Sequence, residues 1–187
     1  LSTLLGADLV HYHSTSWMEG PIMNIRNPDA RLLSLLGKRI AVHYHGDEVR
    51  VHHTKHTFKQ DHSFVSTPDL LEYLPESEWL PNPVDLEIFT RRNQDFTTPG
   101  RVGYYDPPSG TRYISVEDIE RAVARLQEAG FRVESLPARG LRYDQMPEYY
   151  RSLGIFVDLR LVGAYGQMAC EAAASGVPVI SSSSRIR

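Results

Sequence analysis

Residues 163–181 read GAYGQMACEAAASGVPVIS, and the fold is best inferred from this stretch. A Gly-containing loop comes first, small apolar residues typical of a helix follow, Gly176 ends that helix, and an apolar strand comes last. A loop, a helix and a buried strand in this order form one step of an alternating α/β chain. Glu171 is a lone carboxylate on this helix, and its role is the main functional question that the sequence raises.

The same alternation runs through the rest of the chain. Helix 116–130 is the best defined, because apolar residues recur at i, i+3, i+4 and i+7 from Ile119. Asn27 is expected to cap a helix that has Pro28 in its first turn. Strands are expected at 8–13, 39–45, 63–66, within 78–89, and at 101–105, 131–136 and 155–159, and helices at 27–38, 67–74, 116–130 and 143–154. This order predicts parallel sheets covered by helices on both faces.

A Pro-rich crossing at about residues 80–100 divides the pattern into two α/β halves. We expect residues 1–90 to form one Rossmann-like half and residues 91–187 a second, with a cleft between them. Such sheets bind ligands beyond the carboxyl ends of their strands. This rule places His45, the loop at 103–111 and the segment at 163–171 on functional edges.

Composition limits the class of protein. The chain has 187 residues and a net charge of -3, which argues against a general nucleic-acid binder. Its single cysteine, Cys170, excludes an intramolecular disulfide and fits a reducing compartment, so we expect a cytoplasmic protein. No apolar run reaches the roughly 18 residues of a membrane span. Each half is small, so we expect an exposed apolar edge and association as a homodimer or with a protein partner.

The start of the helix in residues 163–181 has the chemistry of a nucleotide site. Free N–H groups at a helix N-terminus suit a phosphate, and Gly166 permits close approach of the ligand to the backbone. The two oxygens of Glu171 match the vicinal hydroxyls of a ribose. The residues alone leave one alternative open, a buried glutamate that hydrogen-bonds neighbouring backbone.

Four stretches of the sequence, in order, carry a resemblance to a known family. They are ADLVHYHS (7–14), GKRIAVHYHGDEVR (37–50), FVSTPDLLEYLPESEWLPNPVDLEIF (64–89) and MPEYYRSLGIFVDLRLVGAYGQMACEAAASGVPVI (146–180). Together they resemble the retaining GT-B glycosyltransferases of the group-1 type. The resemblance implies a GT-B-like fold with two Rossmann-type halves, both shorter than in the family. It also implies that the half at 1–90 faces the acceptor and the half at 91–187 binds a nucleotide-sugar donor.

The resemblance implies roles for individual residues. Glu171 matches the second Glu of the donor signature, which holds the nucleotide ribose. His45 matches a cleft histidine that contacts the donor sugar and is the candidate catalytic residue, although a histidine packed at a strand end fits the sequence too. The donor phosphate takes the acceptor proton in such enzymes, so no protein base is required. The resemblance also implies no catalytic metal or other cofactor. The remaining donor-binding candidates are Gly163, Ala164, Tyr165, Gly166, Gln167 and Thr111.

Three positions depart from the family pattern. Gly163 stands where the signature has its first Glu, Tyr104 where an Arg is expected, and Ser109 where a Lys is expected. Such groups orient the donor sugar and stabilise the leaving diphosphate, and losing one preorganised donor costs on the order of 100-fold in rate. The expected function is sugar transfer from a nucleotide-sugar to an unidentified acceptor with retention. The alternative is a weakened or inactive module of the same fold, which binds a ligand or a partner.

All eight histidines lie between residues 11 and 62. His43 and His45 alternate on one expected strand and so share a face, and His52 and His56 share one if their segment is helical. These rings could bind zinc. No cysteine accompanies them and their spacing matches no compact zinc finger, so we expect no metal. The two histidines of 8–13 fit core or cleft-wall roles equally well.

Overall fold

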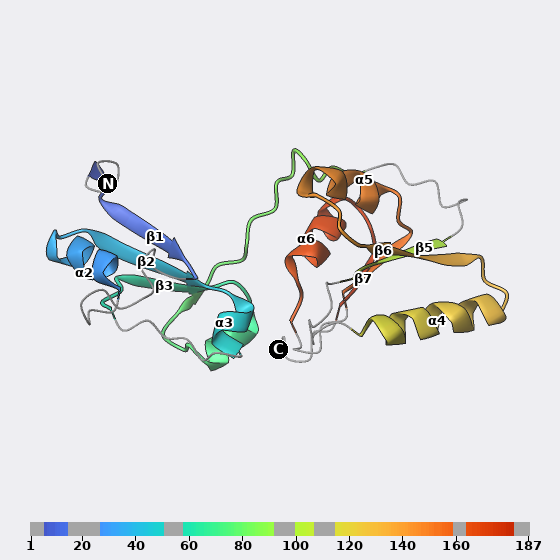
Figure 1. Cartoon of the computed structure of the whole chain (residues 1–187), viewed down its shortest axis with the longest axis horizontal. Helices are drawn as coiled ribbons and strands as arrows, with labels where there is room; N and C mark the ends of the chain where they lie inside the picture. The colour runs from blue at the N-terminus through green and yellow to red at the C-terminus, as the bar shows by residue number, and fades with distance from the viewer. Residues whose placement is uncertain are drawn as a thin grey trace. The chain divides into compact units, whose positions relative to one another are not determined.

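The structure is a computed structural model that describes residues 6–14, 27–50, 58–91, 100–106, 115–158 and 164–181. The chain divides into two compact units, residues 1–82 and 83–187. Each unit contains its own four-stranded parallel sheet (Figure 1). The expected α/β class is therefore confirmed. In the described part of the chain no helix has the length and apolar character to cross a membrane.

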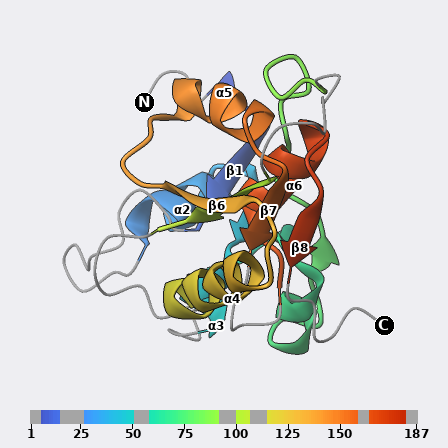
Figure 2. The ribbon, with the colours of Figure 1, turned by 90° about the vertical axis from the view of Figure 1, so that its right-hand side faces the viewer.

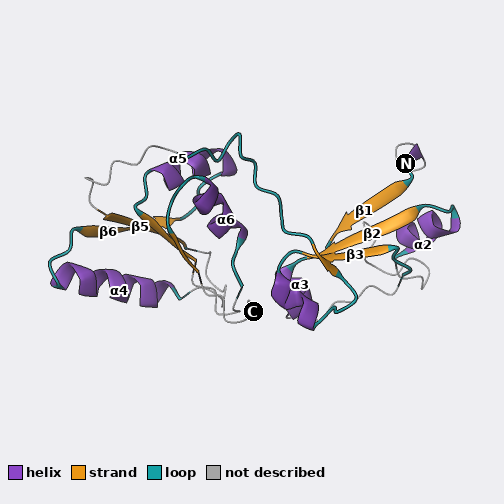
Figure 3. Ribbon diagram, turned by 180° about the vertical axis from the view of Figure 1, so that it is seen from behind, coloured by secondary structure: helices purple, strands orange, loops and turns teal. Residues whose placement is uncertain are grey.

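The first unit has its strands in sequence order, β1-β2-β3-β4, and Figure 3 shows β1, β2 and β3 side by side. Its elements are β1 (Leu9–His13), α2 (Pro28–Leu35), β2 (Arg39–Tyr44), α3 (Gly46–Arg50), β3 (His62–Val65), the 3-10 helix η1 (Pro68–Glu72) and β4 (Glu78–Trp79). The register pairs Leu9 with Arg39 and His13 with His43. Strand β2 lies between two others and is buried over Ile40–Tyr44, which explains its near-continuous apolar sequence.

One face of this sheet carries the core of the first unit. Ile40, Val42 and Tyr44 of β2 lie in it, packed with residues from α2, α3 and η1. Because side chains alternate along a strand, Ala41 and His43 point to the opposite face. His43 is nevertheless only 2% exposed.

The second unit has the strand order β6-β5-β7-β8, with both faces of its sheet covered (Figure 2). Ile119 and Val123 of α4 pack against Val102 on one face, and Tyr150 of α5 and Ala172 of α6 pack on the other. This arrangement confirms the layers that the alternation predicts. The elements are β5 (Gly100–Tyr105), α4 (Val116–Glu128), β6 (Val133–Ala138), the 3-10 helix η2 (Tyr143–Gln145), α5 (Met146–Arg151), β7 (Ile155–Asp158), α6 (Gln167–Ala174) and β8 (Val179–Ser181).

Several local expectations are wrong in part or in full. Asn27 is the N-cap residue of α2, as expected, but its backbone is left-handed (φ 51°) and its side chain makes no cap hydrogen bond. Residues 67–74 form only a short 3-10 helix, closed by i to i+3 bonds such as Leu70 N–H to Thr67 O. Strand β6 runs to Ala138 and includes Pro137, because an edge strand does not need every N–H for pairing.

Helix α2 carries exposed apolar side chains. Leu32, Leu35 and Leu36 at this helix are 51%, 85% and 48% exposed. A homodimer or a complex with a protein partner could bury these side chains. Such association stays a prediction.

Candidate functional site

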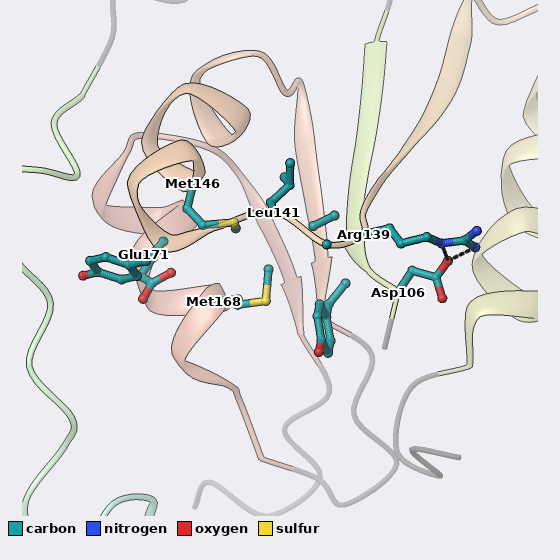
Figure 4. A pocket seen from close by; sticks show the side chains of 10 residues that line it. Asp106, Arg139, Leu141, Met146, Met168 and Glu171 are labelled. Carbon is teal, nitrogen blue, oxygen red and sulfur yellow. Dashed lines mark hydrogen bonds and ion pairs between the residues drawn. The ribbon is translucent and has the colours of Figure 1, made fainter. Parts of the chain in front are cut away.

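A pocket of about 870 Å³ lies at the carboxyl ends of β5 and β6 in the second unit (Figure 4). This is the sheet edge where parallel α/β proteins bind ligands. Apart from two charged groups at the strand ends and Glu171, its lining is mostly apolar and aromatic, which suits a flat organic ring. The lining residues are Tyr105, Asp106, Ala138, Arg139, Gly140, Leu141, Tyr143, Met146, Met168 and Glu171.

Glu171 lies in the second turn of α6 and is 5% exposed. Its carboxylate points toward the space that Met146 and Met168 also line (Figure 4). Tyr150 on α5 donates a hydrogen bond of 3.0 Å to Oε2. Burial raises the pKa of Glu171, and the hydrogen bonds from Tyr150 and Gln167 partly oppose that shift. The protein therefore fixes this acceptor group in a wall of the pocket.

The start of α6 lies where the sequence places it, with Gly166 in extended backbone at the N-cap. The N–H of Gly166 donates to Asp158 Oδ2 over 2.6 Å. Asp158 ends β7 and is 3% exposed. A carboxylate here interacts favourably with the partial positive charge of the helix start. The amide of Gly166 is therefore already hydrogen-bonded. Gln167 and Met168 lie in the first turn of α6, where backbone N–H groups have no acceptor within the helix.

Helix α6 brings several of the predicted donor-binding residues together. Ala164 is buried and Tyr165 is half-buried directly before the helix. The side chain of Gln167 donates to Pro83 O over 3.0 Å, which ties α6 to the start of the second unit. Thr111 and Gly163 lie outside the described residues, as do Ser109, His52 and His56. Ligand binding by these residues stays a prediction.

His45 directly follows β2 in the first unit and is half-buried. Its ring stacks on that of His43 with centroids 4.7 Å apart, which confirms that the two side chains share a face. Burial and then the nearby His13 and His11 lower the pKa of His45. Its backbone N–H donates to Glu48. The strand-end packing weighed as an alternative is therefore present, and contact with a donor sugar stays a prediction.

Tyr104 stands where the resemblance to the family leads one to expect an Arg. It is the fifth residue of β5, and its buried side chain donates to Glu120 of α4, on the opposite face of the sheet from α5 and α6. Among the described lining residues the only cation is Arg139, at the end of β6. Its Nε donates to Asp106 Oδ2 over 2.8 Å.

Sequence reasoning missed Arg139, Asp106 and Asp158 as residues of this region. All three lie at or directly after the last residue of a strand. Charged residues at these positions are the available signal, because the carboxyl ends of parallel strands meet at one edge. Sequence reasoning missed Tyr150 too, whose hydroxyl donates the hydrogen bond to Glu171.

Two parallel α/β units that follow one another along the chain are the architecture of the GT-B class. No protein-family model matches the sequence, and no curated protein matches it significantly. A solved structure that the chain resembles is the sucrose-phosphate synthase from Thermosynechococcus elongatus, a GT-B glycosyltransferase, with a TM-score of 0.54 and 16% identity. The likeness covers 94% of this chain and 56% of that chain. At this identity it establishes the GT-B-like fold alone.

Proposed function

We propose that the chain acts as a glycosyltransferase that binds a nucleotide-sugar donor at its second unit and transfers the sugar to an acceptor with retention. The observation that carries this proposal is the buried carboxylate of Glu171, held by Tyr150 in the wall of a pocket at the ligand-binding edge of a parallel sheet. A buried, preorganised acceptor with two oxygens suits the paired hydroxyls of a ribose.

The rest of the pocket fits the remaining parts of a nucleotide. The side chains of Met146, Met168 and Leu141 offer an apolar surface for the base. The diphosphate would lie near the start of α6, where the amides of Gln167 and Met168 point. Of the amides at 164–167 that are predicted to contact the phosphates, that of Gly166 is bound to Asp158.

The chemistry of the transfer follows from the family resemblance. The bond between the anomeric carbon and the diphosphate breaks while the acceptor oxygen bonds to the same face of that carbon. The leaving phosphate takes the acceptor proton, so the protein need not supply a base. On this proposal His45 orients the donor sugar by hydrogen bonding, and Thr111 binds the phosphates.

A second candidate function is a nucleotide-binding module that does not transfer sugar. Asp158 places a buried carboxylate at the helix start where the diphosphate would bind. Arg139, the pocket's described cation, is paired with Asp106. Position 163 is glycine rather than glutamate. Each feature lowers the stabilisation of a leaving diphosphate while leaving the pocket and Glu171 in place.

Calorimetric titration with UDP, GDP, ADP and their sugars tests the proposal. We expect saturable binding of one base series at micromolar to millimolar concentration, reduced at least tenfold in Glu171→Ala. Glu128→Ala is the matched control, since it removes an exposed carboxylate from the end of α4. Binding that is equal in Glu171→Ala and the wild type would refute the donor site.

Activity separates the two candidate functions. Incubation with the labelled donor of the base that binds should release the nucleoside diphosphate in the presence of an acceptor mixture. Release above the level of Glu171→Ala supports the transferase. Binding without release supports the module.

A further inference from the structure

Three histidines of the first unit form a cluster on the sheet face opposite its core. The parallel register places His13 beside His43, and His11 lies two residues before His13 on the same face. Ring nitrogens of all three lie within 4.8 Å of one another. The ring centroids are 4.6 Å apart for His11 and His13, 5.4 Å for His13 and His43, and 5.9 Å for His11 and His43. Three imidazoles therefore converge on one point.

His43 is the buried member of this cluster. It is 2% exposed, and among the described residues neither of its ring nitrogens has a hydrogen-bond partner. The backbone of Leu80 lies near enough to influence its pKa but makes no hydrogen bond to the ring in this geometry. Buried polar groups are normally paired, so the unpaired imidazole of His43, beside two other imidazoles, is open to a ligand.

We propose that His11, His13 and His43 bind a divalent ion of the zinc class. Three imidazole nitrogens are an established zinc ligand set that leaves the fourth tetrahedral position open. Zinc–nitrogen distances of about 2.0–2.1 Å place the ligand nitrogens about 3.3 Å apart, so the side chains must rotate to close the observed spacing of up to 4.8 Å when the ion binds. His11 and His13 are exposed, so an ion enters from solvent without opening the core.

His45 is a positioning residue for this site. Its Nε2 lies 3.4 Å from His13 Nδ1. When Nδ1 of His13 carries the proton, it donates to His45 and leaves Nε2 of His13 for the metal. A hydrogen bond to the second nitrogen commonly orients a metal-binding histidine in this way.

Zinc titration of the full chain tests the proposal. The protein, expressed without a histidine tag and treated with chelator, is titrated with Zn²⁺ by calorimetry at pH 7.5, and bound zinc is counted by atomic emission. We expect one ion per chain with a micromolar or tighter Kd. The double variant His11→Ala/His13→Ala should weaken binding at least tenfold, and because both side chains are exposed it should still fold.

His62→Ala is the matched control. His62 begins β3 in the same sheet and stacks on Phe64 at 6.2 Å, outside the cluster of three. Its removal should leave the zinc affinity unchanged. The visible absorption of bound Co²⁺ gives a second readout, with tetrahedral bands expected in the wild type and lost in His43→Asn, whose folding is checked by circular dichroism.

Two results would overturn the proposal. One is the absence of bound zinc in the wild type. The other is binding that survives in the double variant, because the ion would then bind elsewhere on the chain. In either case the histidines form a packed aromatic surface only.

Discussion

Asp158 and Glu171 are buried carboxylates on either side of the start of α6, and their surroundings differ. Asp158 accepts the backbone N–H of Gly166 at the helix start, where its charge is favourable. Glu171 accepts from the phenol of Tyr150, and its burial raises its pKa. Keeping Glu171 charged at neutral pH therefore costs stability, a cost that proteins commonly carry at functional positions.

Glu171→Gln should stabilise the protein in a pH-dependent way. The folded-state pKa of Glu171 lies above its ordinary value of 4.5, so the wild type loses stability as pH rises from about 4.5 through the folded pKa. Glutamine keeps the shape and accepts from Tyr150 without a charge. Thermal melting of both proteins between pH 4 and 8 should show a difference that starts near zero and grows with pH. A difference that stays constant, or a less stable variant at pH 7, would contradict the assignment, and Glu128→Gln should show no trend.

Asp158→Asn should lower the folding stability of the protein and raise its affinity for anions. Removing the charge at the start of α6 costs about 0.3–1 kcal/mol of folding free energy. The same change relieves repulsion of a diphosphate at that position, so its affinity should rise by about three- to tenfold. The unphosphorylated nucleoside is the control ligand and should bind equally to both proteins. Equal binding of the diphosphate to both proteins would show that phosphate lies away from Asp158.

The sequence places Glu171 on a helix that begins after Gly166, because glycines and small apolar residues mark that helix locally. The contacts that shape the site are not local. Tyr150 reaches Glu171 from a separate helix, and Asp158 meets Gly166 only when β7 lies beside α6. For the same reason the convergence of His11, His13 and His43 follows from strand register and not from spacing along the chain.

Helix α6 ends at Gly176, and its end depends on the absence of a side chain there. The backbone of Gly176 is left-handed (φ 79°), and an added Cβ would lie 2.8 Å from Cγ of Arg91. Gly130 ends α4 in a similar conformation (φ 87°) with no atom within 4 Å of an added Cβ. A comparison of the two positions therefore separates the cost of the left-handed backbone, which both share, from the steric contact with Arg91, which only Gly176 has.

Gly176→Ala should therefore destabilise more than Gly130→Ala. The left-handed conformation costs roughly 1–2 kcal/mol of folding free energy in both variants. The contact with Arg91 adds a further cost in Gly176→Ala only. Chemical denaturation measures the two free energies of unfolding. Equal losses would show that the Arg91 side chain moves aside freely.

At the level of elements, periodicity and turn residues predict the strands and α4 well. Helix α4 is expected at 116–130 and runs from Val116 to Glu128. The errors occur where the local signal is weak or tertiary packing decides. Residues 67–74 read as a helix but form the 3-10 helix η1, which buries Leu70 in the first core. The end of β6 lies beyond the expected residue 136 because pairing with β5 continues to Ala138.

The two units have separate cores, so ligands at separate sites should stabilise them separately. A ligand at a free concentration of 100 times its Kd stabilises the folded unit that binds it by about 2.7 kcal/mol. Hydrogen exchange should slow in β1 and β2 with zinc, and in α5 and α6 with the nucleoside diphosphate that binds. Protection by zinc that is confined to the second unit would contradict the histidine site. Protection by the nucleotide that spares α6 would contradict the role of Glu171.

The strand orders of the two sheets also set how each unit forms from the unfolded chain. In the first sheet every strand pairs with its neighbour in sequence, beginning with Leu9 beside Arg39. In the second sheet the first strand, β5, is central, and its pairing of Val102 with Ile155 requires a longer loop to close. Long-range parallel pairing slows folding. During synthesis the first unit can add its strands one at a time, whereas β5 keeps an open edge until β7 has been made, and this edge is where we expect misfolding to begin.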